Sequence, residues 1–223
     1  LEAATNEITS DPNFSELKKK YIVDELSTLV GFLEMGKAMT GKTVEDSFRG
    51  EVERLSSSYD SIREAKLEAK KNNERLDKFI ELVGAEATII DKYKGYLTLS
   101  VNFKNDFNKD VLYIVMNYKY INEYDTKFFE ENVKVTNEIG GDFKGQVDLT
   151  TSEEYNSAAE FLYSKVPVRA PKAMRDELGE DVANKKRMSD FLLEGLQVKT
   201  TMVVFKDKSQ IEYQNADWKY LGN

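Results

Sequence analysis

The hydrophobic pattern of this 223-residue chain changes its period at Gly95, and this change limits the folds open to it. Before Gly95, apolar residues recur about every 3.5 positions, as they do in a helix that packs along one seam. From Leu97 to Phe103, apolar and polar residues alternate instead, which is typical of a strand with one buried face. The pattern therefore predicts a helical region over residues 11–94 and a β domain over residues 95–223.

Two helices are expected in the helical region. The first begins after Asp11 and Pro12, which suit a helix cap and a first helical position, and it ends near Met39. We favour a second, continuous helix of about 45 residues over a hairpin broken at residues 71–73, because neither Gly nor Pro marks a turn there. Its apolar residues occupy the two seam positions of one heptad register: Phe48, Val52, Leu55, Tyr59, Ile62, Ala69, Leu76, Ile80, Val83, Ala87 and Ile90.

Lys66 and Asn73 interrupt the apolar seam of the second helix. The seam either packs on the first helix and the β domain or meets a second copy of itself in a coiled coil. Polar residues near the centre weaken a dimeric seam, so we expect a monomer or a weak homodimer.

Beyond Gly95, polar turns separate short segments rich in β-forming residues, and strands at this spacing favour an antiparallel sandwich. These segments are residues 97–103, 111–120, 128–136, 143–149, 196–205 and 210–213. Residues 153–165 and 181–194 have helical patterns and are expected as insertions between strands. The predicted fold class is α+β, with long N-terminal helices followed by an antiparallel β-sandwich that contains inserted helices. One core is expected to hold Leu97, Leu99, Val101, Phe103, Val133, Val135, Val147 and Leu149.

Histidine and cysteine are both missing from the sequence. The chain therefore lacks the common nucleophile pairs, the commonest general base, thiolate zinc ligands and disulfides. Asp106, Asn108 and Asp110 form an acidic turn, but it lacks the glycine and distal glutamate of an EF-hand calcium loop. We therefore assign no catalytic, cofactor-binding or metal-ligating residues, and we expect a protein that is not an enzyme.

The net charge and the hydropathy of the chain argue against two kinds of interaction, nucleic-acid binding and a membrane-spanning helix. The net charge of −8 argues against nucleic-acid binding, because phosphate recognition needs clustered lysine and arginine. No stretch of the sequence reaches the roughly 18 consecutive apolar residues that a membrane-spanning helix needs.

The segment Gly36–Thr43 matches the phosphate-binding loop pattern G-x-x-x-x-G-K-[ST] completely. A working loop of this kind leaves a buried parallel strand and enters a helix. Residues 17–33 have a helical period instead, and Gly41 and Thr43 also suit a helix stop and the cap of the next helix. Nucleotide binding through Gly36–Thr43 is therefore the alternative function.

Aromatic residues crowd the second and third predicted strands and the turn between them. Tyrosine and phenylalanine suit both strand cores and recognition surfaces. Core packing is favoured, and the possible partner surface is assigned to the same six residues: Tyr113, Tyr118, Tyr120, Tyr124, Phe128 and Phe129.

Four short motifs cover roughly residues 41–150: Gly41-Lys42-Thr43-Val44-Glu45, Leu97-Thr98-Leu99-Ser100-Val101-Asn102-Phe103-Lys104-Asn105, Lys109-Asp110-Val111 and Ile139-Gly140-Gly141. In this order they resemble a family of bacterial lipoproteins of unknown function, in which a long charged helix precedes an immunoglobulin-like β-sandwich. The segment from Tyr155 to Gly195 departs from the family pattern by adding helices.

The resemblance implies a secreted protein tethered by a lipid on a cysteine upstream of Leu1. Its expected location is the bacterial cell envelope, in the periplasm or on the outer surface. The resemblance brings no catalytic residues. The sequence therefore predicts a non-enzymatic secreted or lipid-anchored envelope protein that binds an unknown protein or ligand through its sandwich or its helix, and that meets the membrane only through the anchor.

Overall fold

The computed structural model describes residues 2–40, 44–91, 94–124, 126–136, 140, 144–150 and 157–222. The chain has a mixed α and β fold, and its strands pair antiparallel. It divides into two compact units. The helical unit comprises residues 1–71 with residues 214–223, and the β unit comprises residues 72–213.

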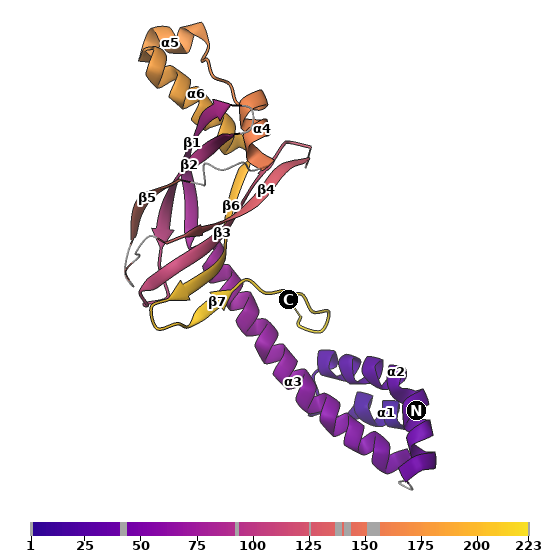
Figure 1. Cartoon of the computed structure of the whole chain (residues 1–223). Coiled ribbons are helices and arrows are strands. Elements are labelled where there is room, and N and C mark those ends of the chain that lie inside the picture. Colours follow the sequence, from indigo (N-terminus) through magenta and orange to yellow (C-terminus); the bar gives the residue numbers. More distant parts are fainter. Residues whose placement is uncertain are drawn as a thin grey trace. The chain divides into compact units, whose positions relative to one another are not determined.

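The helical unit contains α1 (Glu2–Ser10), α2 (Glu16–Thr40) and most of α3 (Val44–Asp77) (Figure 1). α2 begins later than the sequence predicts, because the Ser15 hydroxyl caps it by accepting a hydrogen bond from the Lys18 amide at 3.3 Å. The helices pack through buried apolar side chains that include Ile8, Tyr21, Ile22, Leu26, Phe48, Leu55 and Tyr59.

The long heptad segment is a helix only as far as Asp77, and residues Ile80–Asp91 form strand β1. The prediction of one helix that reaches Ile90 is therefore wrong. The alternative break at residues 71–73 is also wrong, because these residues lie inside α3.

β1 pairs with β2 (Lys94–Lys104) in a register that places Ile80 opposite Phe103. An irregularity between Leu82 and Gly84 shifts the alternation of β1, so that its apolar residues happen to satisfy a heptad pattern as well. Backbone pairing with β2 makes this segment a strand and not a helix, because a short apolar run alone is compatible with either the helical or the strand period.

The β unit has two antiparallel sheets, one with the strand order β1-β2-β5 and one with the order β4-β3-β6-β7. The remaining strands are β3 (Val111–Ile121), β4 (Lys127–Val135), β5 (Lys144–Thr150), β6 (Leu196–Phe205) and β7 (Gln210–Glu212). Each of these strands falls on a segment that the sequence predicts as a strand.

Helices α4 (Ser157–Lys165), α5 (Lys172–Leu178) and α6 (Glu180–Gly195) are inserted between β5 and β6. Figure 1 shows them at the end of the β unit where the hairpin of β3 and β4 turns. α4 and α6 lie on the predicted helices, although residues 153–156 fall outside the described residues. The sequence did not predict α5, which has no buried residue and therefore no apolar period to detect.

The two sheets share one hydrophobic core. Its members include residues predicted to face inward: Leu97, Leu99, Val101, Phe103, Val135 and Leu149. Val133 packs against this core, and the side chain of Val147 is outside the described part of the chain. Phe79, just past the end of α3, places its ring 5.8 Å from the ring centroids of both Phe103 and Phe107. The segment that directly follows α3 is thus part of the core of the β unit.

The C-terminal segment, residues 214–222, belongs to the helical unit, although it directly follows the β unit in the chain. Trp218 and Tyr220 complete an aromatic cluster with Tyr21 and Tyr59, in which the centroids of contacting rings lie 5.2 to 5.6 Å apart. Such tilted and edge-on contacts stabilise beyond the burial of apolar area.

Hydrogen bonds hold the C-terminal segment to both long helices. The Tyr220 hydroxyl donates to the Asp24 carboxylate at 2.7 Å, and this bond, with help from the Lys219 ammonium, lowers the pKa of Asp24. The Tyr59 hydroxyl donates to the Tyr220 carbonyl at 3.2 Å. The Lys66 ammonium donates to the Asn215 carbonyl, so this polar seam residue has its partner within its own chain.

A buried hydroxyl in the β unit gives the first testable prediction. Thr200 on β6 is 1% exposed, and its hydroxyl has no hydrogen-bond partner among the described residues. Thr200→Val replaces that hydroxyl with a methyl group, so we expect the free energy of unfolding to rise by about 1 kcal/mol in urea denaturation. The control Thr201→Val removes a hydroxyl that donates to the Val115 carbonyl at 3.1 Å, and it should not stabilise. A Thr200→Val protein no more stable than the wild type would contradict this prediction.

The aromatic cluster of the helical unit gives the second testable prediction. Trp218→Ala removes three ring contacts from the helical unit, and we expect it to lower the free energy of unfolding of that unit by about 2 kcal/mol, measured by circular dichroism at 222 nm. The neighbouring Lys219→Ala removes an exposed ion pair with Asp24 and an exposed cation–π contact with Tyr220, and it should change stability little. If the two substitutions lowered the free energy of unfolding equally, the ring contacts of Trp218 would contribute no more to stability than the contacts of Lys219.

Candidate functional site: the helical end of the β unit

The six aromatic residues singled out from the sequence separate into two groups. Tyr118, Tyr120 and Phe129 are buried in the core of the β unit. Tyr124 and Phe128 are exposed, at 77% and 43%, and Tyr113 is half-buried at another place on the sheet. The buried residues therefore contribute packing, and the exposed ones contribute surface.

The Tyr120 ring is the centre of an aromatic cluster at the helical end. Its centroid lies 4.5 Å from that of Phe161 on α4, 5.8 Å from that of Phe191 on α6 and 6.2 Å from that of Phe129 on β4. The Tyr120 hydroxyl donates to the Phe191 carbonyl at 3.2 Å, and burial raises the pKa of this phenol. The cluster thus fixes the inserted helices to the sheet.

The cluster reaches the surface at Phe128. The centroid of this ring lies 5.0 Å from that of Phe161, while almost half of the side chain remains exposed. Phe128 is therefore an exposed aromatic residue whose ring packs on the buried aromatic cluster.

Further large apolar side chains are exposed on the inserted helices and their connections. Val168, in the segment between α4 and α5, is 68% exposed. Together with the exposed aromatic residues they define what we call the cap surface: Tyr124, Phe128, Tyr163, Val168, Leu178 and Val182. Apolar residues at such exposures over one end of a unit are a common mark of a binding surface.

The segment that carries Val168 is held in place by hydrogen bonds. The Ala170 amide donates to the Asn184 side-chain oxygen at 2.8 Å, and the Arg175 guanidinium donates to the Ala170 carbonyl at 3.1 Å. Glu180 lies 3.6 Å from both Arg169 and Arg175. Val168 is thus presented to solvent by an ordered segment.

α6 also covers the free edge of β1. The Ala87 amide donates to the Met188 sulfur at 3.2 Å, and the Lys185 ammonium lies 3.4 Å from the Glu86 carboxylate. Open strand edges invite pairing with other chains, so this helix protects the edge while it supports the cap surface.

The inserted segment has no net charge, although the whole chain carries −8. Residues 157–195 contain seven lysines and arginines and seven aspartates and glutamates. The apolar side chains that the inserted segment contributes to the cap surface therefore lie among balanced charges, whereas Tyr124 and Phe128 lie in a stretch of sequence with more acidic than basic residues.

The other motifs from the sequence lie elsewhere. Residues 36–40 of the Gly36–Thr43 motif lie within α2, so a helix and not a strand precedes it, and residues 41–43 are outside the described residues. In the acidic turn, Asp106 and Asp110 face the ammonium groups of Lys104 and Lys206 at 3.5 and 3.9 Å. Over the ranges described, no group of three or more acidic side chains is placed to hold a metal ion.

No family model matches this sequence, and neither a curated protein nor a solved structure shows significant similarity to it. None of the helices in the described ranges is both long enough and apolar enough to span a membrane.

Sequence reasoning missed Tyr163, Val168, Leu178 and Val182. Leu178 and Val182 have acidic residues beside them, and Tyr163 and Val168 closely follow other apolar residues, so each of the four can equally be part of a helix core. The available signal was the set of helix-breaking residues Pro167, Pro171 and Gly179, which separates Val168 and Leu178 from any long apolar period.

The junction of α6 and β6 gives the third prediction. A Cβ atom at Gly195 would lie 2.5 Å from the Ile121 carbonyl oxygen and 2.6 Å from the Tyr120 ring. We expect Gly195→Ala to lower the free energy of unfolding of the β unit by about 3 kcal/mol, because backbone and a packed ring must both move. Gly50→Ala in α3, where nothing lies within 4 Å of the added atom, is the control and should be neutral or stabilising. Chemical denaturation of both variants measures the difference, and a neutral Gly195→Ala would contradict the packing described.

Proposed function

We propose that this protein is a non-enzymatic binding protein of the bacterial cell envelope, and that a partner protein docks on its cap surface. The observation that carries the proposal is the exposure of Tyr124, Phe128, Tyr163, Val168, Leu178 and Val182 at one end of the β unit. Large exposed apolar side chains gathered at one end of a domain are a recurring feature of interaction sites in soluble proteins.

The chemistry of the partner follows from the charge of the cap. Because residues 157–195 have no net charge, the inserted segment itself favours neither an acidic nor a basic partner. Phe128 and Tyr124 are the aromatic types that dominate the energetics of interface centres. We therefore expect a protein partner with an apolar, uncharged docking surface.

The order of the strands supports an immunoglobulin-like interpretation of the β unit. In the constant-type immunoglobulin fold, numbered along the chain, the sheets are 1-2-5-4 and 3-6-7. Here the sheets are β1-β2-β5 and β4-β3-β6-β7, so the orders agree once the fourth strand moves from the edge of one sheet to the edge of the other. We propose an immunoglobulin-like sandwich with its inserted helices between the fifth and sixth strands.

The envelope location and the lipid anchor remain part of the proposal. They rest on the resemblance of the motifs between residues 41 and 150 to bacterial lipoproteins. The lack of histidine and cysteine supports a binding role over catalysis, since the commonest acid–base and nucleophilic groups are missing.

Site-specific photocrosslinking in the native bacterial cell gives the fourth prediction. A photoreactive amino acid at Val168 should capture a discrete partner, identified by mass spectrometry. Val168→Asp combined with Val182→Asp should abolish capture from a probe at Tyr163, because charge on the cap surface opposes apolar docking. Both sites are exposed, so stability should change by no more than about 0.5 kcal/mol.

A probe at Leu67 on α3 provides the matched control, since this side chain is also apolar and exposed. Capture from Leu67 alone would place the partner on the helical unit and refute the cap surface. A protein found in the cytosol, without partners at any probe, would refute the envelope role as well.

A further inference from the structure

The Met188 thioether lies where helix α6 contacts strand β1. β1 is an edge strand of the sheet β1-β2-β5, so an amide that points away from β2 needs an acceptor outside the sheet. For Ala87 that acceptor is the Met188 sulfur, which lies 3.2 Å from the amide nitrogen. A thioether is a weak acceptor, so this hydrogen bond depends on the close approach of the helix to the strand.

Met188 also supplies apolar packing between α6 and the β unit. Its side chain is half-buried and packs against the core of that unit. The ion pair between Lys185 and Glu86 spans the same contact at 3.4 Å, but both side chains are exposed and such a pair contributes little. The last part of α6 is held elsewhere, since the Phe191 ring stacks on the Tyr120 ring of β3 at 5.8 Å. Met188 therefore contributes both a hydrogen bond and apolar packing to the contact of α6 with β1.

The sulfur of this side chain is also a target for two-electron oxidants. A sulfur lone pair attacks one oxygen of hydrogen peroxide, so that an S–O bond forms and the O–O bond breaks. The departing hydroxide takes the proton of the transferred oxygen and leaves as water, while the thioether is oxidised to the sulfoxide. Met116 is 0% exposed, whereas Met188 is half-buried. Of these two methionines, Met188 is therefore the one open to an oxidant in solution.

The sulfoxide does not fit the contact that the thioether makes. An oxygen placed between the Met188 sulfur and the Ala87 nitrogen, which lie 3.2 Å apart, would require α6 to move away from β1. An oxygen turned toward the core would be a buried polar group, which costs free energy. An oxygen turned toward water would leave an electron-poor sulfur as a still weaker acceptor for the amide. Each arrangement weakens the packing of α6 on the strand.

We propose that Met188 is an oxidation site, and that conversion of its thioether to the sulfoxide by a peroxide releases the middle of α6 from the edge of β1. The released strand presents the Ala87 amide to water, and an open strand edge of this kind can pair with other chains. Reduction of the sulfoxide restores the contact. Met188 is not part of the cap surface, so the proposal does not depend on the proposed partner.

Hydrogen–deuterium exchange of the full chain before and after treatment with hydrogen peroxide is the test. Peptide mass spectrometry reports the sulfoxide at each methionine, and we expect to find it at Met188. Peptides that contain Ala87 or Met188 should exchange about tenfold faster in the oxidised protein, because local opening becomes easier, whereas peptides from β3 should be unchanged. Treatment with methionine sulfoxide reductases should return the exchange to its starting rate.

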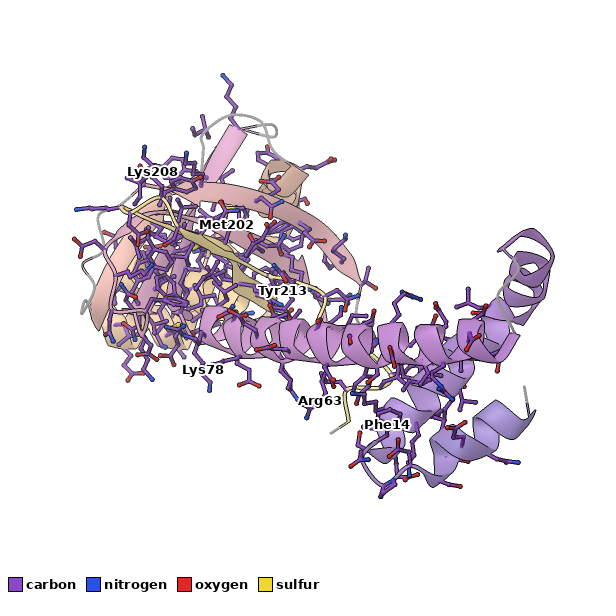
Figure 2. All side chains as sticks on the ribbon, turned by 90° about the horizontal axis from the view of Figure 1, so that it is seen from below. Phe14, Arg63, Lys78, Met202, Lys208 and Tyr213 are labelled. Atoms are coloured by element: carbon purple, nitrogen blue, oxygen red, sulfur yellow. The ribbon has the colours of Figure 1, made fainter. Side chains whose placement is uncertain are left out.

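Three variants serve as controls. Met188→Leu removes the oxidisable sulfur but keeps an apolar side chain of similar volume, so peroxide should leave its exchange unchanged. Met202 is also half-buried and lies on β6 (Figure 2), and Met202→Leu should respond to peroxide as the wild type does. Met188→Gln places a polar amide near the position of the sulfoxide and should exchange faster without any oxidant.

Three results would overturn the proposal. The first is a protein in which Met188 stays reduced while Met202 is oxidised. The second is oxidation of Met188 without faster exchange of the peptide that contains Ala87, and the third is a Met188→Leu protein that responds to peroxide as the wild type does. Circular dichroism checks that each variant is folded, and the comparison of oxidised with reduced wild-type protein needs no variant.

Discussion

The rest of the β unit depends on a chain of aromatic contacts that joins its two sheets. Phe103 on β2 packs against Phe79, Phe79 packs against Phe107, and Phe107 lies 5.4 Å from Phe205 on β6. The Arg75 guanidinium covers the Phe107 ring at 3.9 Å and donates to the Asp106 carbonyl. These contacts close the two sheets over one core and fix the last turn of α3 to that core. The inserted helices then have a firm sheet to pack on.

Local pattern was enough to predict β2, β3, β4, β6 and β7, because alternation along each strand is the direct consequence of one buried face. β1 could not be predicted in the same way. Its irregular alternation around Leu82 and Gly84 also satisfies a heptad, and only its pairing with β2 decides the structure. The packing of the C-terminal segment could not be predicted from local pattern either, because no such pattern indicates that Trp218 contacts Tyr21 and Tyr59.

Only part of the candidate site could be predicted from the sequence. Aromatic crowding marked the right hairpin, but Tyr120 and Phe128 are close neighbours with opposite fates, one buried and one exposed. What separates them is the position of Phe161 and Phe191, which arrive from helices far along the chain. The apolar residues of α5 and its flanks, such as Val168 and Val182, differ from core residues only in their surroundings.

The assignment of residues 214–222 to the helical unit has a consequence for biosynthesis. The ribosome makes α1, α2 and α3 before the β unit, and it makes Trp218 and Tyr220 after the β unit. Domains generally fold as units, in order from the N-terminus, while the chain is still being made. Here the helical unit lacks two of its four clustered aromatic rings until the whole β unit has been translated. Tyr21 and Tyr59 therefore lack these two packing partners while the β unit is being made, and a chain that stops before Trp218 would leave this cluster incomplete and recognisable to quality-control factors.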